Sequence, residues 1–375
     1  MSEAEVGPVF EAQMTNGCDR ELDANLSGGI ASWHDRDADA ESNTRLRAAV
    51  AQFRTPSLPQ ALWQLASTLA GFIGVCTLMY ATFGASYGLT LGLAVIAVGF
   101  TVRVFIIQHD CGHGSFFASP RANMLVGCLC SLITFTPYEN WRRQHAGHHA
   151  VWNNLDRRDS GVDIYATCLT VFEYRALSAQ RRFLYRLSRH AIVTGLILPP
   201  FIFLLLYRFP FDTPKGARRE RLSVHATNAG ITVLYATLGS IFGFEPMLFI
   251  QLPIIAIASI VGVWLFAVQH RFEETLWQRE DEWNFTAASL RGSSFLKLPR
   301  TLQWFTGNIG FHHVHHLNPR IPNYRLEACY RAIPALRAVP SLGLGDALRA
   351  PCFALWDEER RRMVTFRTAR ACAAA

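Results

Sequence analysis

The chain has 375 residues, half of them hydrophobic, and a formal net charge of +7 at neutral pH. Two soluble domains would fit this length, but several apolar runs of about 20 residues, enough to span a bilayer, favour an integral membrane protein. The positive charge does not indicate nucleic-acid binding, because the arginines cluster beside the apolar runs, as in cytoplasmic loops of membrane proteins.

Polar and acidic residues without periodicity fill positions 1–44, where we predict a disordered N-terminal tail. The membrane domain is expected to cover 45–366, with a short tail at 367–375. Two apolar runs around a five-residue turn predict a hairpin of transmembrane helices at about 63–83 and 89–107. A hairpin returns the chain to its starting side, so both of its outer ends face one compartment.

Two further apolar segments are expected to enter the membrane without crossing it. Residues 123–138 are too short for a span and suit an interfacial or re-entrant helix. Residues 192–207 contain Pro199-Pro200 at their middle and are flanked by basic residues at both ends. The positive-inside rule places both ends on one side, so we predict a re-entrant hairpin that turns at the prolines.

A second hairpin is predicted at about 226–242 and 247–268, and residues from 287 onward are assigned to a cytosolic cap. The predicted fold is therefore an all-α integral membrane protein. It has four transmembrane helices in two hairpins, re-entrant or interfacial segments, and a cytosolic helical cap.

Nine of the thirteen histidines fall in three short windows: HDCGH at 109–113, HAGHH at 145–149 and HHVHH at 312–316. Neutral imidazole is a common ligand of transition metals. The spacings i, i+4 and i, i+3, i+4 place the histidines of each window on one helix face, His313 excepted. No cysteine pair at zinc-finger spacing accompanies them, which argues against a closed structural zinc site.

His270 joins the candidates because it follows the last predicted span as His109 follows the second. The candidate metal ligands are His109, His113, His145, His148, His149, His270, His312, His315 and His316. Nine imidazoles exceed what one four-coordinate ion uses, so two metals fit better, and a pair of irons with positions left for dioxygen fits best. Three histidines without such neighbours are assigned to surface or interfacial positions: His34, His190 and His225.

The other ring nitrogen of a metal-bound imidazole needs an acceptor of its own. Polar residues near the windows could fill this role, and the sequence does not rank them: Asp110, Glu139, Asp159, Asp163, Glu273 and Asn308. A site at a membrane face with apolar walls suggests a lipidic substrate. Side-chain acids and bases cannot attack an unactivated methylene, whereas metal-activated dioxygen can.

The three boxes resemble those of the membrane fatty acid desaturases, in particular the bacterial acyl-lipid type. Flanking residues are similar too, and the likeness covers about 46–366: FRTPSL at 53–58, VQHRFE at 268–273, GNIGF at 307–311 and WDEE at 356–359. The resemblance implies a di-iron centre held by the nine histidines. This centre uses dioxygen and two electrons to remove two hydrogens from the acyl chain of a membrane lipid or acyl thioester, which leaves a cis double bond.

The first box has three residues between its histidines, where some branches of the family have four. This favours the Δ12-like acyl-lipid branch over the Δ9 acyl-CoA branch without fixing the bond position. No haem-binding pattern is present, so the resemblance implies an external electron donor, either ferredoxin-like or a small cytochrome. The arginine-rich stretch 142–189 either docks an acidic carrier or contacts anionic lipid head groups. We expect a bacterial inner-membrane protein with the boxes and both termini facing the cytoplasm.

Three other functions compete with this prediction. A related di-iron hydroxylase or ketolase acting on a lipid, alkane or carotenoid has similar boxes, and only the flanking residues favour a desaturase. A metal transporter needs polar ligands at membrane depth, but the predicted spans hold no Asp, Glu, Lys or His and one arginine, Arg103. A non-catalytic scaffold has no use for nine histidines at ligand spacing.

Overall fold

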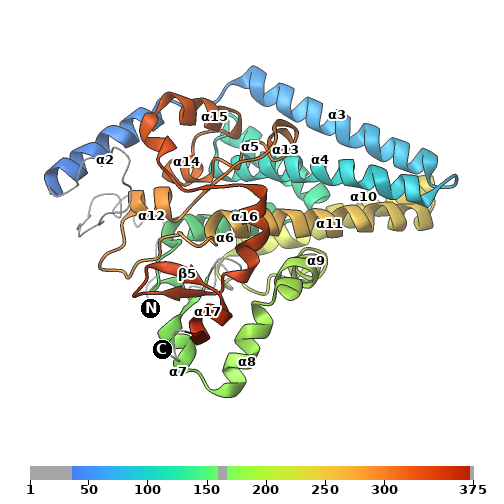
Figure 1. The fold of residues 1–375 in the computed structure, drawn as a ribbon. Coiled ribbons are helices and arrows are strands. Elements are labelled where there is room, and N and C mark those ends of the chain that lie inside the picture. Colours follow the sequence, from blue (N-terminus) through green and yellow to red (C-terminus); the bar gives the residue numbers. More distant parts are fainter. Residues whose placement is uncertain (1–35, 159–166, 372–375) are drawn as a thin grey trace.

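The computed structural model describes residues 36–158 and 167–371, without the side chains of 36–40 and 371. Most of the predicted tail, 1–35, lies outside the described residues, as do 372–375, His34, Asp159 and Asp163. Helices dominate the described part of the chain (Figure 1).

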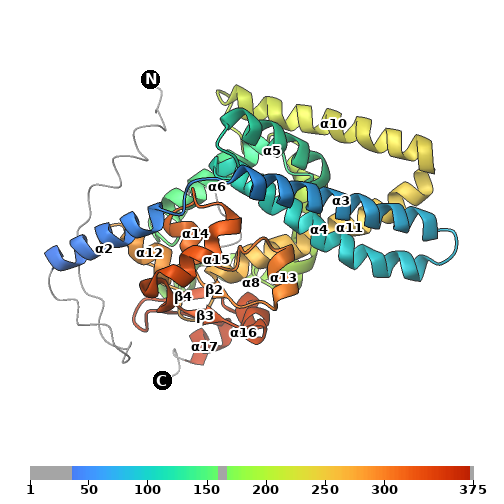
Figure 2. The ribbon, with the colours of Figure 1, turned by 90° about the horizontal axis from the view of Figure 1, so that it is seen from above.

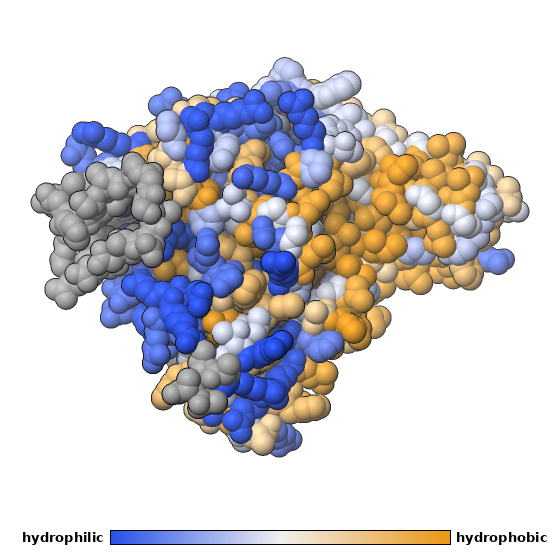
Figure 3. Space-filling model, viewed as in Figure 1, coloured by the Kyte–Doolittle hydropathy of each residue, from blue (hydrophilic) through white to orange (hydrophobic). Residues whose placement is uncertain are grey.

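Four long helices lie side by side and form one half of the molecule (Figure 1): α3 (Leu58–Thr82), α4 (Tyr87–His113), α10 (Arg218–Phe242) and α11 (Phe244–His270). Of these, α3, α4 and α11 are long and apolar enough to cross a membrane. The surface of this half is largely hydrophobic, whereas hydrophilic residues gather over the other half (Figure 3). Large apolar side chains that face outward on α3 and α4 require lipid around them. The chain is therefore a helical membrane protein.

Three of the four predicted spans correspond to α3, α4 and α11. The fourth, 226–242, lies within α10, which is less apolar because Asn228 and several hydroxyl residues interrupt it. The hydroxyls of Thr232, Thr237 and Ser240 each donate to the carbonyl four residues earlier. These groups are thus satisfied inside the helix. Whether α10 crosses the membrane stays a prediction.

The two hairpins bring the last turns of α4 and α11 together. Helix α4 begins where the Ser86 hydroxyl accepts from the Leu89 amide at 3.3 Å, and α11 begins after Gly243, whose φ of 93° favours glycine. Helices α3, α4 and α11 pack through small and aliphatic side chains, Ala97 and Ile254 among them. Both α4 and α11 end in a histidine.

Helix α5 (Pro120–Thr134) connects α4 to α6 (Tyr138–Val151). With 15 residues it is about 22 Å long, short of the roughly 30 Å hydrocarbon core. The rings of His113 and His145, which precede and follow it, have centroids 4.9 Å apart. The chain therefore returns to one side between them, in agreement with the prediction for 123–138.

The prediction that 192–207 turns at Pro199-Pro200 is wrong. After α7 (Val171–Ala176) and α8 (Ala179–Ser188), the chain bends by 47° and then stays helical from 193 to 208. This stretch comprises a π-helical turn (Val193–Ile197), α9 (Leu198–Leu204) and a 3₁₀ turn (Leu206–Arg208). The prolines occupy the first turn of α9, where a helix tolerates their missing N–H groups.

The cap gathers at the end of the bundle opposite the two hairpin turns (Figures 1 and 2). Its helices are short: α12 (Phe285–Arg291), α13 (Arg300–Phe305), α14 (His312–Leu317), α15 (Asn323–Ala332), α16 (Leu344–Arg349) and α17 (Phe366–Ala371). Two small sheets join them, with β1 (Leu169–Thr170) parallel to β4 (Leu355–Asp357), β4 antiparallel to β5 (Arg362–Val364), and β2 (Phe295–Leu296) parallel to β3 (Ser341–Leu342). These strands of two or three residues leave the fold mainly helical.

Helix α2 (Arg36–Ala51) shows that the predicted disordered tail extended too far, because residues 36–44 are helical. An ion pair one turn apart joins Arg45 to Glu41 at 2.6 Å. At the end of α2, the buried Val50 packs into the core of α14 and α15. That apolar anchor stabilises a helix whose acidic first half gave no periodic signal.

Arg103, the single arginine of the predicted spans, joins the cap to the membrane helices. It is buried in α4, where its Nε donates to the Thr68 hydroxyl of α3 at 3.1 Å. Its guanidinium donates to the Trp304 carbonyl of α13 and lies 4.0 Å from the centroid of the Trp304 indole. These hydrogen bonds and the cation–π contact thus compensate the Arg103 guanidinium for the hydration that it loses on burial.

Two glycines of α3 provide a matched test of this packing. A Cβ at Gly71 would collide with the ring of Phe100, which packs edge-on against Phe305, whereas a Cβ at Gly74 meets nothing within 4 Å. We expect Gly71→Ala to destabilise the protein by about 1–3 kcal/mol through overpacking. Gly74→Ala should leave stability unchanged or raise it slightly. Thermal unfolding in detergent measures both, and equal melting temperatures for the two variants would contradict the close approach of α3 and α4.

Candidate metal centre

Four helices carry the nine predicted ligands to one place. Helix α4 carries His109 and His113 on its last turns, and α11 carries His270 at its end. Helix α6 carries the three histidines of the second box, and the short α14 carries those of the third. The chain enters α14 through Gly307 and Asn308, which have φ values of 52° and 60°. This left-handed turn directs the third box toward the ends of α4 and α11.

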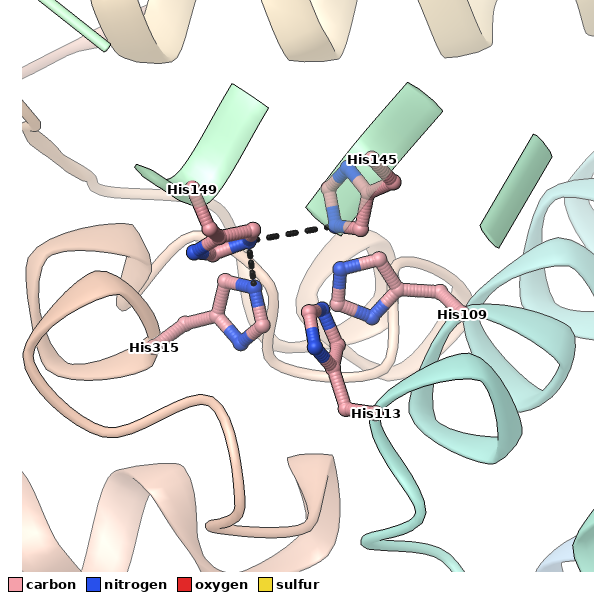
Figure 4. Close-up of side chains that lie close together, drawn as sticks. All are labelled: His109, His113, His145, His149 and His315. Carbon is pink, nitrogen blue, oxygen red and sulfur yellow. Dashed lines mark hydrogen bonds between the residues drawn. The ribbon is translucent and has the colours of Figure 1, made fainter. Parts of the chain in front are cut away.

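The nine imidazoles form two adjacent groups. In group one, one ring nitrogen from each of five histidines lies within 4.8 Å of all the others (Figure 4): His109, His113, His145, His149 and His315. In group two, the corresponding nitrogens of three histidines satisfy the same limit: His148, His270 and His316. His312 adjoins group two, because its Nε2 lies 2.9 Å from that of His270 and 3.0 Å from that of His316.

The nitrogen spacings within each group fit a shared cation. Two nitrogens each about 2.1 Å from one ion and at a right angle are about 3.0 Å apart. The Nε2 of His149 lies 3.2 Å from that of His145 and 3.1 Å from that of His315 (Figure 4). The Nε2 of His270 is similarly close to two others, at 3.1 and 2.9 Å. Each neutral Nε2 has either one hydrogen or one lone pair, so hydrogen bonds alone serve such chains of nitrogens poorly.

Burial keeps these rings in the form that binds metals. Both His145 and His316 are buried, and their pKa values lie well below the usual range because burial disfavours the charged form and neighbouring imidazoles repel it. The same causes lower the pKa values of His149, His312 and His315. The Nε2 atoms of His109 and His113 are buried without a hydrogen-bond partner among the described residues. Neutral imidazoles with converging free nitrogens are a suitable donor set for transition-metal ions.

Among the described members of the predicted supporting set, Asp110 is the one that contacts a candidate ligand. His109 donates from Nδ1 to Oδ1 of Asp110 at 3.1 Å, and Oδ2 accepts from the backbone and side-chain amides of Asn323 at 2.6 and 2.8 Å. The carboxylate therefore fixes the orientation of the ring and ties α4 to α15. The carbonyl of Gly292 does the same for His270, whose Nδ1 lies 3.2 Å from it. A backbone acceptor of this kind has no sequence signal.

The other described members of that set have different partners. Glu139 pairs with Arg142 and Arg219, and the exposed Glu273 pairs with Arg362. Asn308 donates to the carbonyl of Asn323 at 3.1 Å. These residues hold the helices and cap together, and none of these bonds reaches an imidazole.

His313 stands apart from both groups, as its different helix face predicted. Its Nε2 lies 3.1 Å from the Leu336 carbonyl, and burial lowers its pKa to about 4. His190 and His225 are exposed, in agreement with their assignment to the surface. Two tryptophans that the sequence analysis did not select cover the centre. The Trp141 indole stacks on His145 with a centroid distance of 4.6 Å, and Trp152 lies 4.4 Å from His316.

A cavity of about 210 Å³ reaches the two groups from the membrane half. Its walls are mainly aliphatic and aromatic side chains from α4, α9 and α11, including Val102, Ile202 and Val263. Imidazoles from both groups line it: His109, His145, His148 and His312. A metal pair held by the two groups would therefore face an apolar space of the kind that accepts a hydrocarbon chain.

Fold and site together define a helical membrane protein with a polyhistidine metal centre at one end of an apolar cavity. The model of the fatty acid desaturase family matches residues 86–343, and the chain belongs to this family. It is therefore an oxidoreductase, as the resemblance of its histidine boxes implied.

Individual relatives agree with this assignment. A fatty acid desaturase of Bacillus subtilis (strain 168) is 44% identical over 329 residues, which cover 88% of this chain and 92% of the relative. The acyl-lipid omega-3 desaturase (cytochrome b5) of the Arabidopsis thaliana endoplasmic reticulum is 29% identical, covering 61% of this chain and 59% of its own. The chloroplastic sn-2 acyl-lipid omega-3 desaturase (ferredoxin) of Helianthus annuus is also 29% identical, covering 62% and 53%.

The contact between Asp110 and His109 predicts how tightly metal is held. We expect Asp110→Asn to weaken metal affinity about 10- to 100-fold, because the amide cannot accept from both His109 and Asn323 as the carboxylate does. Glu139→Gln is the matched control, since its carboxylate contacts arginines instead of an imidazole. Metal retained by each purified protein against graded chelator concentrations gives the measurement. Equal retention by both variants and the unsubstituted protein would contradict this role of Asp110.

Proposed function

We propose that this desaturase holds two iron ions through its nine clustered histidines and introduces a cis double bond into the acyl chain of a membrane lipid. The observation that carries the proposal is the position of two groups of neutral imidazoles on the wall of an apolar cavity. With dioxygen, two electrons and two protons, the bound metals supply the oxidising power to remove two hydrogens from adjacent methylenes, and water is the other product. Group one would hold one ion and group two, with His312, the other.

The protein's own residues position the chain and exclude water. The aliphatic walls of α4, α9 and α11 hold the methylenes against the imidazoles that line the cavity. The Trp141 and Trp152 indoles shield His145 and His316. Asp110 and the Gly292 carbonyl hold two rings in fixed tautomers. The result is a dry, rigid site in which an inert hydrocarbon is held close to the metals.

An intact lipid suits this site better than a soluble carrier thioester. Helix α8 exposes Phe183 and Leu187 together with Arg181, which is typical of a helix that lies in the interface of an anionic membrane. Basic residues are also exposed at the same end of the bundle as the centre, among them Lys215 and Arg218. By the positive-inside rule this end faces the cytoplasm of a bacterial inner membrane, with four spans including α10.

The electrons come from a separate carrier of the ferredoxin or cytochrome type. Relatives named for cytochrome b5 and for ferredoxin support both classes equally. Part of the arginine-rich stretch 142–189 is engaged within the protein, since Arg157 pairs with Glu280 and Arg158 with Glu173. The exposed Arg181 of α8 is assigned to the membrane surface, whereas Arg186 donates to the Tyr174 hydroxyl, so we assign the carrier to the cap. Product formation by the purified protein, measured with a reduced ferredoxin and with a reduced cytochrome b5, distinguishes the two classes of carrier.

Expression in a host without the activity tests the function. The unsubstituted chain should produce monounsaturated acyl chains in the host's lipids, measured by mass spectrometry. We expect His316→Ala to lower product at least about 100-fold and to reduce the iron content, because group two loses a ligand. His313→Gln, on the same helix but with the His313 Nε2 3.1 Å from the Leu336 carbonyl instead of facing the other imidazoles, should keep both.

The chemical nature of the product distinguishes a desaturase from a hydroxylase, the remaining alternative. Hydroxylation adds an oxygen atom to the acyl chain and desaturation does not. An oxygenated product would therefore replace the desaturase proposal by a hydroxylase, and full activity of His316→Ala would overturn the assignment of the metal ligands.

A further inference from the structure

The cavity beside the candidate metal centre has two parts of different character, a long arm lined by α11 and a short arm lined by polar residues. Along α11 it is lined from Gln269, beside the centre, to Ile255. The ring of Phe266 has its centroid 4.9 Å from that of His148, so Phe266 marks the level of the centre. At 1.5 Å per residue, Ile255 lies about 16 Å deeper along the helix. Most side chains that line this arm are apolar, such as Ala258 and Val263.

Polar residues line another part of the cavity, which we call the short arm: Gln144, Tyr207 and Asp212. Gln144 directly precedes His145 on α6. The Gln144 amide donates to the Asp212 carboxylate, and the Tyr207 hydroxyl lies 3.5 Å from Oε1 of Gln144. Because Gln144 adjoins the candidate ligand His145 in sequence, this polar part of the cavity lies beside the centre. Phe211, which is 58% exposed, marks where the cavity meets the surroundings.

Charge and hydrogen bonding fix which end of a lipid fits which arm. An ester buried in the long arm would lack hydrogen-bond donors along most of its walls, at a cost of a few kcal/mol. In the short arm, the Gln144 amide has a second N–H besides the one that Asp212 accepts, and the Tyr207 hydroxyl can exchange its long 3.5 Å contact with Gln144 for an ester oxygen. Arg143, which pairs with Asp212 at 3.1 Å, and Lys215, which is exposed three residues after Asp212, suit the phosphate of a head group.

We propose that the acyl chain binds with its ester at Gln144 and Tyr207 and its methyl end in the long arm toward Ile255. The double bond then forms in the half of the chain nearer the ester, at a position counted from the ester. This inference rests on the proposed desaturase function and adds the orientation of the substrate. Tyr207 and Gln144 are positioning residues, and Gly262 and Ala258 limit the length of the methyl end.

Variants of the long arm provide the first test. A Cβ at Gly262, one turn deeper than Phe266, meets nothing within 4 Å, so a larger residue enters open space in the cavity. In membranes with acyl chains of 14, 16 and 18 carbons, the unsubstituted protein should place every double bond at one distance from the carboxyl carbon. Ala258→Leu should reduce conversion of the 18-carbon chain at least about tenfold and spare the 14-carbon chain. Gly262→Leu should restrict all three chains.

Gly92→Leu is the control for these variants, because Gly92 is an exposed position of α4 where a Cβ is also free of contacts. It should leave the chain-length profile unchanged. Bond positions at a constant distance from the methyl end, or unaltered profiles in Ala258→Leu and Gly262→Leu at normal iron content, would overturn the inference. Absence of any unsaturated product from the unsubstituted chain would instead count against the desaturase function itself.

The short arm gives an independent readout. Tyr207→Phe removes one donor to the ester and should raise KM about tenfold with little change in kcat or iron content, since the hydroxyl binds the substrate before reaction as well as during it. The products of this variant should include bonds shifted along the chain, because the ester is held less firmly. Unchanged KM and a single unshifted product would exclude the ester from this position.

Discussion

The structure depends on one constraint, which is that nine imidazoles, eight of them buried and that of His113 partly buried, share a small volume without enough hydrogen bonds among themselves. A buried polar atom without a partner costs about 1–3 kcal/mol, and the Nε2 atoms of His109 and His113 are in this state among the described residues. Burial and neighbouring imidazoles hold the pKa values of His149 and His316 well below the usual range, so protonation does not relieve the crowding of these rings at neutral pH. A cation bound by group one would satisfy the Nε2 atoms of both His109 and His113 at once, so we expect metal binding and the packing of the cap to be linked.

The same constraint determines the topology. Because α4 and α11 both carry ligands on their last turns, the two helices must run in the same direction and end at one level. Each then needs a preceding helix that returns from the opposite side, and α3 and α10 provide this return. The 15-residue α5 fits the arrangement because it connects two ligand helices without crossing. The cap closes the site through α14, and Arg103 fastens α13 to α4 close by.

Features with a periodic or clustered signal could be predicted from the sequence, and features that depend on distant contacts could not. The spacing of the boxes predicted which histidines share a helix face. The position of His270 directly after an apolar run predicted that it joins them, and its ring lies beside those of His148 and His316. Helix α2 was missed over 36–44 because its stability comes from Val50 packing on the cap. The Pro199-Pro200 pair indicated a turn, but a preceding π-helical turn places both prolines in the first turn of a helix.

The supporting residues around the centre illustrate the same limit. Asp110, Glu139 and Asn308 all lie near a box in sequence, yet only the first contacts a candidate ligand, because Arg219 takes the carboxylate of Glu139. Trp141 and Trp152 carried no signal, since an aromatic residue beside a box is equally suited to a core position. Their coverage of the rings becomes evident only when α6, α12 and α14 are seen together.

Access to the centre follows from how its faces are closed. On the cap side, the Trp152 indole donates to the Ala288 carbonyl of α12 and lies against the ring of His316. The indole and α12 therefore cover the imidazoles on this side. The described cavity that reaches the imidazoles is instead walled mainly by apolar side chains of α4, α9 and α11, and the exposed Phe211 lies on its lining. Such a space suits a hydrocarbon chain from a surrounding bilayer, whereas a water-soluble reagent would meet the cap before the imidazoles. The closed cap thus keeps water away from the rings, as the oxidising metal pair proposed above would require.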